Sequence, residues 1–182
     1  MEGKTCFFIG HREAPDSLLP ILDAEVERHI TEYGVMDFVV GRYGHFDSMA
    51  ARCVKAAKKR HPKVTLTLLL PYHSYDHPIQ APPGFDGTFY LPGMETVPKR
   101  AAIIRANRYM VEHSNHLIAY AWHSDNAWDL VEYAKRRENH VHIVSPSPFT
   151  RCPGQRPNQY ELASSEFVKT NSLSQILEKN GP

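Results

Sequence analysis

Short apolar runs alternate with amphipathic helical patterns along most of this chain. The runs lie at residues 5–9, 38–40, 64–70, 116–122 and 140–144, and residues 88–90 are a candidate for a further short strand. Helical patterns occupy residues 16–34, 46–61, 95–113 and 126–134. Continuous apolar strands joined by helices are typical of a parallel sheet covered on both faces. The pattern predicts an α/β, Rossmann-like three-layer αβα domain with a mainly parallel five-stranded sheet.

The alternation of apolar runs and helical patterns ends near residue 145. Residues 1–145 are expected to form the Rossmann-like domain. Four prolines follow at positions 146, 148, 153 and 157, and residues 161–179 have a weak helical period. We expect residues 146–182 to be a Pro-rich tail and short helix packed on the same domain.

Composition limits the classes of function. The chain has 21 basic and 20 acidic residues, so it lacks the strongly basic character of most nucleic-acid-binding domains, and we expect no nucleic-acid partner. No apolar run approaches the roughly 20 residues of a membrane span, and no signal-peptide pattern is present. Three widely spaced cysteines argue against a disulfide framework. We therefore expect a cytoplasmic protein without a membrane partner; a homodimer or higher homo-oligomer is left open.

The candidate site follows from the predicted sheet, because ligands of such sheets bind at the carboxyl ends of the strands. There we expect a cation, two glycine turns, carboxylates, aromatic rings and two helix N-termini, a set that suits a nucleotide phosphate and ribose. The alternative is a tight turn that binds nothing. The expected ligand-binding residues after the strands are Gly10, His11, Arg12, Gly41, Tyr43, Gly44, Phe46, Tyr72, Asp125 and Asn126, and Asp47 is a candidate catalytic carboxylate.

Two further candidates lie in the helical pattern of residues 95–113. Arg100 and Asn107 are seven residues apart and project onto its apolar stripe. A buried charge needs a partner, which is either a phosphate or carboxylate of a ligand or an ion pair within the protein.

The histidines raise the question of a metal. His73 and His77 share a loop, and His140 and His142 share one face of a strand. Neither pair has cysteine or acidic partners at a familiar spacing. We therefore expect no metal and no cofactor.

Four segments together resemble the SLOG superfamily, closest to its YpsA/DprA-like group. They are Phe-Ile-Gly-His-Arg at residues 8–12, Val-Gly-Arg-Tyr-Gly-His-Phe-Asp-Ser at 40–48, Arg-Ala-Asn-Arg-Tyr-Met at 105–110, and the strand at 117–122. The resemblance covers residues 4–145. It implies a Rossmann-like fold and a nucleotide-derived ligand. Members of this superfamily include the Lonely Guy phosphoribohydrolases, sensors of NAD-derived signals in bacterial immunity, and proteins that bind single-stranded DNA.

One family motif is largely absent. The phosphoribohydrolases carry Pro-Gly-Gly-x-Gly-Thr-x-x-Glu, whereas residues 124–132 read Ser-Asp-Asn-Ala-Trp-Asp-Leu-Val-Glu, so that only Glu132 matches. The first hypothesis is therefore a sensor or sequestering protein that binds a nucleoside monophosphate, NAD or an ADP-ribose-like molecule. The alternative is an N-glycosidic hydrolase with Asp47 or Glu132 as the catalytic carboxylate. A third class is an interaction protein with a vestigial pocket.

Overall fold

The computed structural model describes residues 3–72, 80–137 and 139–144. The predictions for residues 146–182, and the pair His73 and His77, lie outside these residues. No helix in the described ranges combines the length and the apolar character needed to cross a membrane.

The described residues form six strands and four α-helices, with one short 3-10 helix. In chain order they are β1 (Lys4–Gly10), η1 (Asp16–Leu18), α1 (Leu19–Thr31), β2 (Val35–Val40), α2 (His45–Lys58), β3 (Thr65–Leu70), β4 (Gly87–Tyr90), α3 (Lys99–His113), β5 (His116–Tyr120), α4 (Asn126–Arg136) and β6 (His140–Ile143).

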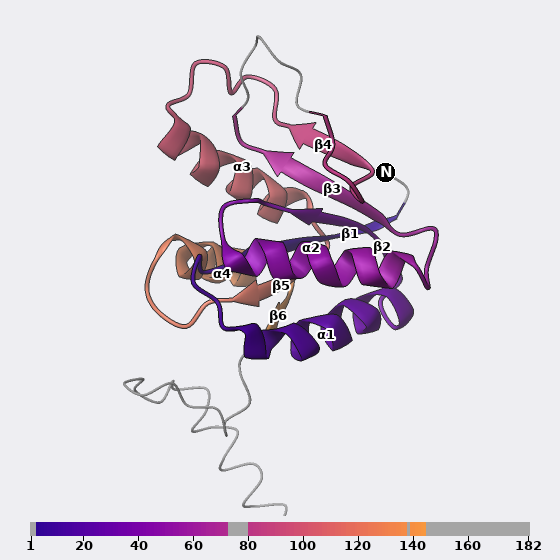
Figure 1. Cartoon of the computed structure of the whole chain (residues 1–182). Helices are drawn as coiled ribbons and strands as arrows, with labels where there is room; N and C mark the ends of the chain where they lie inside the picture. Colours follow the sequence, from indigo (N-terminus) through magenta and orange to yellow (C-terminus); the bar gives the residue numbers. More distant parts are fainter. Residues whose placement is uncertain (1–2, 73–79, 138, 145–182) are drawn as a thin grey trace, which may run out of the picture. The chain divides into compact units, whose positions relative to one another are not determined.

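All six strands belong to one sheet, in the order β4-β3-β2-β1-β5-β6 (Figure 1). Every neighbouring pair is parallel. The predicted three-layer α/β architecture is confirmed, but the predicted number of strands is wrong, because the sheet has six strands and not five. The sixth is β4, a four-residue edge strand whose residues are all at least partly exposed. Such a strand has too short an apolar run to be counted with confidence from its pattern.

The helices cover both faces of the sheet, α1 and α2 on one and α3 and α4 on the other. Side chains of a strand alternate between the faces. In β1, Cys6 and Phe8 therefore pack with α1 and α2, while Phe7 and Ile9 pack with α3 and α4.

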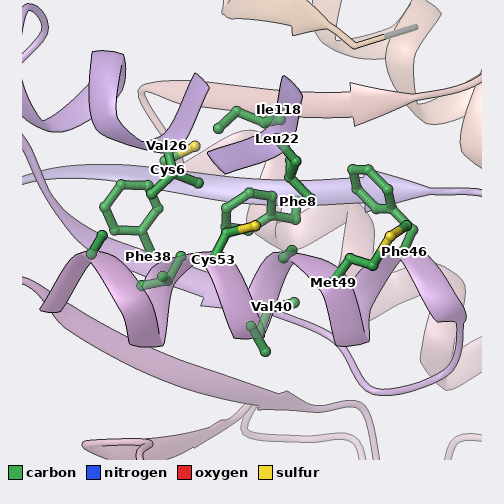
Figure 2. Close-up of a cluster of buried hydrophobic side chains, with 14 of the residues drawn as sticks. Cys6, Phe8, Leu22, Val26, Phe38, Val40, Phe46, Met49, Cys53 and Ile118 are labelled. Carbon is green, nitrogen blue, oxygen red and sulfur yellow. The ribbon is translucent and has the colours of Figure 1, made fainter. Parts of the chain in front are cut away.

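Figure 2 shows the first of these two cores. The side chains of Phe46, Met49 and Cys53 project from one side of α2 onto β1 and β2, as the helical period predicts. Phe8 and Phe38 stack beneath them, with ring centroids 5.9 Å apart. This packing fixes the first turn of α2 against the end of β1, and so positions the loops at the carboxyl edge.

The first predicted helix starts differently from the prediction. Asp16 makes no capping hydrogen bond, and α1 itself begins only at Leu19. The Asp16 carboxylate instead lies 2.8 Å from Nε2 of His45, on α2.

The helix predicted from residue 95 begins only at Lys99, after the extended Pro98. Proline disfavours helical geometry in the residue before it, here Val97, so the helix cannot begin earlier. Arg100 is exposed, so its predicted place on a buried stripe is wrong. The buried face is formed by Ala102, Ala106, Met110 and Val111, and small alanines leave this face without a strong apolar signal.

Candidate functional site

The order of the strands reverses beside β1. The chain builds β2, β3 and β4 outward on one side, and α3 then returns it to β5 on the other side of β1. The carboxyl ends of β1 and β5 are neighbours, with Gly10 opposite Tyr120. In open parallel sheets the ligand crevice lies at such a switch point.

A cavity of about 190 Å³ lies at this switch point. It brings together most of the predicted site residues, contributed by four separate segments of the chain. Those lining it are Gly10, Arg12, Gly41, Tyr43, Gly44, Asp47, Asn107, Asp125 and Asn126. The cavity also has apolar lining that the site prediction did not include, from Phe7, Phe8, Ile9, Ile103, Ala127 and Leu130.

The glycines at this edge allow segments of the protein to approach each other. A Cβ on Gly44 would lie 2.9 Å from Cα of Arg12. A Cβ on Gly10 would lie 2.2 Å from Cδ1 of Phe46. The backbone N–H of His45 donates to the carbonyl of Arg12 at 2.8 Å, which joins the start of α2 to the loop after β1. These glycines therefore bring the two loops together around the cavity.

Asp47 is a half-buried carboxylate at the cavity. Its Oδ2 accepts the backbone N–H of Tyr43 at 2.9 Å and lies 2.9 Å from where a Cβ on Gly41 would stand. Burial raises the pKa of Asp47, and hydrogen bonds from the backbone N–H groups of Tyr43 and Gly44 offset only part of this effect. The raised pKa makes Asp47 a better proton carrier than an exposed aspartate.

A second polar arrangement holds the start of α4. Oδ1 of Asp125 accepts the backbone N–H groups of Ala127 at 2.8 Å and Trp128 at 3.0 Å, so Asp125 caps the helix. Its Oδ2 lies 2.6 Å from Nδ1 of His11. Burial by itself would raise the pKa of Asp125, but the hydrogen bonds from Trp128, His11 and Ala127 together lower it.

His11 supports this loop and does not line the cavity. Its ring is 3% exposed, and its Nε2 accepts the backbone N–H of Trp122 at 2.9 Å. The ring proton therefore lies on Nδ1, which donates to Asp125. Burial lowers the pKa of His11, and Asp125 opposes that shift. His11 is thus a neutral imidazole that positions Asp125 and the loop between β5 and α4.

Arg12 supplies a cation at the same cavity. Its side chain is exposed and lines the opening. None of the carboxylates in the described part of the chain lies within ion-pair distance of its guanidinium. A guanidinium in this position is available to a phosphate or carboxylate of a ligand.

The other predicted site residues lie away from the lining. Phe46 is fully buried in the core, and Arg100 is exposed on α3. Tyr72 packs beside Tyr43, with ring centroids 6.0 Å apart. Glu132 pairs with Nζ of Lys135 at 2.8 Å and does not line the cavity.

No protein-family model matches this chain, and no curated protein matches it. Two solved structures of the Moco carrier protein from Chlamydomonas reinhardtii are similar to it. One has a TM-score of 0.50 at 16% identity, covering 81% of this chain and 80% of that chain. The other has a TM-score of 0.49 at 15% identity, covering 78% and 76%. At this identity the first likeness shows a shared α/β fold and nothing finer.

Proposed function

We propose that this protein binds a nucleotide-derived small molecule at the carboxyl edge of its sheet, as a sensor or sequestering protein, and that it belongs to the SLOG superfamily. The observation that carries the proposal is the cavity at the switch point. It combines the guanidinium of Arg12, the start of α2 and the carboxylates of Asp47 and Asp125. Sites of this composition, at this place in a parallel sheet, are typical of nucleotide ligands.

The phosphate is expected at Arg12 and the first turn of α2. No side chain caps α2, whose N-cap is Gly44. The positive end of a helix dipole and a guanidinium both favour an anion. Arg12 and Gly44 line the same cavity, so one phosphate can contact both elements.

The sugar is expected beside the carboxylates. Asp47 lines the cavity, and each carboxylate oxygen has two lone pairs, so Asp47 can accept from ribose hydroxyls beside its bonds to the backbone. The cavity of about 190 Å³ is smaller than the roughly 300–1,000 Å³ of sites for drug-sized ligands. It suits the phosphate and ribose that a nucleoside monophosphate, NAD and ADP-ribose share. The base would then lie at the mouth, beside the ring of Tyr43.

Two of the motifs that resemble the SLOG superfamily converge on this cavity. The motif at residues 8–12 contributes Gly10 and Arg12, and the motif at 40–48 contributes Gly41, Gly44 and Asp47. Residues that lie more than 25 positions apart in the sequence thus share one site. This convergence supports the superfamily and its nucleotide-derived ligand.

The second candidate function is N-glycosidic hydrolysis, favoured by Asp47. A half-buried carboxylate at a cavity, with a pKa raised by desolvation, is a common feature of catalytic sites. Glu132 gives no support, because it follows the cap Asp125 by seven residues, about 10 Å along the helix, and pairs with Lys135. With one of the two candidate carboxylates outside the cavity, we favour binding without rapid cleavage.

The test is calorimetric titration of the protein with AMP, ADP-ribose and adenosine. Arg12→Ala should weaken AMP by about 10- to 100-fold, because a charge-assisted hydrogen bond contributes about 1.5–3 kcal/mol. Adenosine should lose much less. The matched control is Arg42→Ala, which removes an exposed arginine of the neighbouring turn that does not line the cavity.

Two results would overturn the proposal. One is that AMP, NAD and ADP-ribose all fail to bind. The other is that Arg12→Ala weakens adenosine as much as AMP, which would make Arg12 a structural residue. Chromatography after incubation should recover intact AMP; rapid release of the base, lost in Asp47→Asn, would select the hydrolase instead.

A further inference from the structure

Three histidines from three separate elements meet near the opposite, amino edge of the sheet. They are His29 of α1, His116 of β5 and His142 of β6. The ring of His29 lies 4.5 Å from that of His142 and 5.3 Å from that of His116, measured between centroids. One ring nitrogen from each histidine can be chosen so that the three atoms lie within 4.8 Å of one another.

Two of these histidines are buried, and each has one ring nitrogen without a hydrogen bond. His29 is 0% exposed and His116 is 4% exposed. Nε2 of His29, Nδ1 of His116 and Oε1 of Glu25 are buried without a hydrogen bond; elsewhere in the described ranges, only Oγ of Ser114 shares this condition. Leaving a buried polar atom unsatisfied costs about 1–3 kcal/mol, so two such ring nitrogens in one place call for a ligand.

Glu25 orients two of the rings. Its backbone carbonyl lies 2.7 Å from Nδ1 of His29, and its Oε1 lies 3.2 Å from Nδ1 of His142. If each Nδ1 carries the proton, the other nitrogen of both rings presents a lone pair. Histidines that bind a metal commonly donate their second nitrogen to a carbonyl or carboxylate in this way. Burial also lowers the pKa of His29 and of His116 to about 4, which leaves both rings neutral at pH 7.

A second cluster shows why this arrangement is distinctive. His11, His123 and Asp125 also bring three potential ligand atoms together. There, however, Nδ1 of His11 is bonded to Asp125 and Nε2 accepts the N–H of Trp122. Because hydrogen bonds already use both nitrogens of His11, that cluster has no free lone pair on its buried ring.

We propose that His29, His116 and His142 bind a divalent transition-metal ion of the zinc class, with Glu25 as the residue that orients the ligands. Imidazole nitrogens suit zinc, which binds them at about 2.0–2.1 Å in tetrahedral geometry. Ligand atoms are then about 3.3 Å apart, so the present spacings, all within 4.8 Å, must close by at most about 1.5 Å. His142 can make this adjustment, because it lies on an edge strand and its side chain is 23% exposed.

The fourth coordination position can face solvent. A cavity of about 450 Å³ opens beside His116 and His142, and Lys4 and Arg137 also line it. This cavity gives an ion a route to the histidines and leaves room for a water molecule or an anion as the fourth ligand. The metal site lies at the other edge of the sheet from the proposed nucleotide site, so neither proposal depends on the other.

The experiment uses the full chain, freed of metal with a chelator and then titrated with Zn²⁺ by calorimetry. A single ion per chain is expected, and Co²⁺ at the same site should give the visible absorption of a tetrahedral complex. His142→Ala should weaken Zn²⁺ binding by more than the roughly 10- to 100-fold expected for Glu25→Gln, since loss of an outer partner typically costs that much. The matched control is His113→Ala, an exposed histidine of α3 that lies outside the cluster and should bind as the parent does.

A measurement on the unmodified chain tests the site even if a variant fails to fold. X-ray absorption of the zinc-loaded parent should show three imidazole nitrogens at about 2.0–2.1 Å. Absence of Zn²⁺ binding by the parent would overturn the proposal. So would fewer than three imidazoles around the ion, a folded His142→Ala variant with the affinity of the parent, or an equal loss in His113→Ala.

Discussion

Replacing Asp125 by alanine tests the polar arrangement that holds the cavity together. The carboxylate accepts backbone N–H groups of Ala127 and Trp128 at 2.8 and 3.0 Å, and it lies 2.6 Å from Nδ1 of His11. In Asp125→Ala the helix loses its cap. The ring N–H of His11, which is 3% exposed, loses its acceptor.

The expected cost follows from these two losses. An N-cap removed to alanine costs about 0.5–2 kcal/mol. A buried donor left without an acceptor costs about 1–3 kcal/mol. The side chain of Asp125 is itself 35% exposed, so water reaches the freed groups and screens part of the attraction. We therefore expect Asp125→Ala to lower the free energy of unfolding by about 2–3 kcal/mol.

The assay is urea unfolding, followed by far-UV circular dichroism and tryptophan fluorescence. The matched control is Asp129→Ala, which removes the same charge from an exposed position in the first turn of α4 and should cost about 0.3–1 kcal/mol. Asp125→Asn should fall between the two, because asparagine caps a helix well but its NH₂ group cannot accept from His11. Equal losses for Asp125→Ala and Asp129→Ala, at equal dependence on urea, would refute the reasoning.

Two further predictions concern the other side of the cavity. Gly10→Ala should lower the free energy of unfolding by about 1–3 kcal/mol, because its Cβ would lie 2.2 Å from the ring of the buried Phe46. The control Gly87→Ala, whose Cβ meets nothing within 4 Å, should lose no stability. Equal urea midpoints for the two variants would contradict the close approach of Gly10 to Phe46. Burial raises the pKa of Asp47 in the folded protein above its value in the unfolded chain. Protonated Asp47 therefore stabilises the folded protein below the usual carboxyl pKa near 4, and this stabilisation is lost as the pH rises through the raised pKa. Urea unfolding between about pH 4 and pH 7 should therefore show Asp47→Asn gaining stability relative to the parent, and a constant difference across that range would count against a raised pKa.

Most of the fold could be predicted from local patterns of apolar residues in the sequence. The apolar strands and the stripe of α2, with Phe46, Met49 and Cys53 on one side, could be predicted because burial imposes a period on the residues themselves. The same reasoning failed where that period is weak. β4 is short and partly exposed, and the buried face of α3 is built partly on Ala102 and Ala106, so Arg100 was placed on the wrong side.

The cavity is an intermediate case. Gly10 ends β1, Arg12 lies in the loop after it, and Gly41 follows β2; parallel strands end at one edge, so the meeting of these residues follows from topology alone. The role of His11 does not. It precedes Arg12 in the sequence, yet its ring turns inward to Asp125, more than 100 residues away. The neighbour that a loop side chain contacts depends on the path of the loop, and the local sequence pattern does not predict that path.

The histidine cluster belongs to the tertiary structure alone. The sequence led us to expect no metal, because neither the pair His73 and His77 nor the pair His140 and His142 has cysteine or acidic partners at a familiar spacing. His29, His116 and His142 are separated by 87 and 26 residues, so no short spacing joins them. They meet because β5 and β6 are neighbours in the sheet and the buried face of α1 packs near their amino ends. A periodic pattern shows that a helix face is buried, but it does not identify the strands that bury it. That choice depends on the strand order and on the lateral position of the helix, both of which are set by packing of the whole domain.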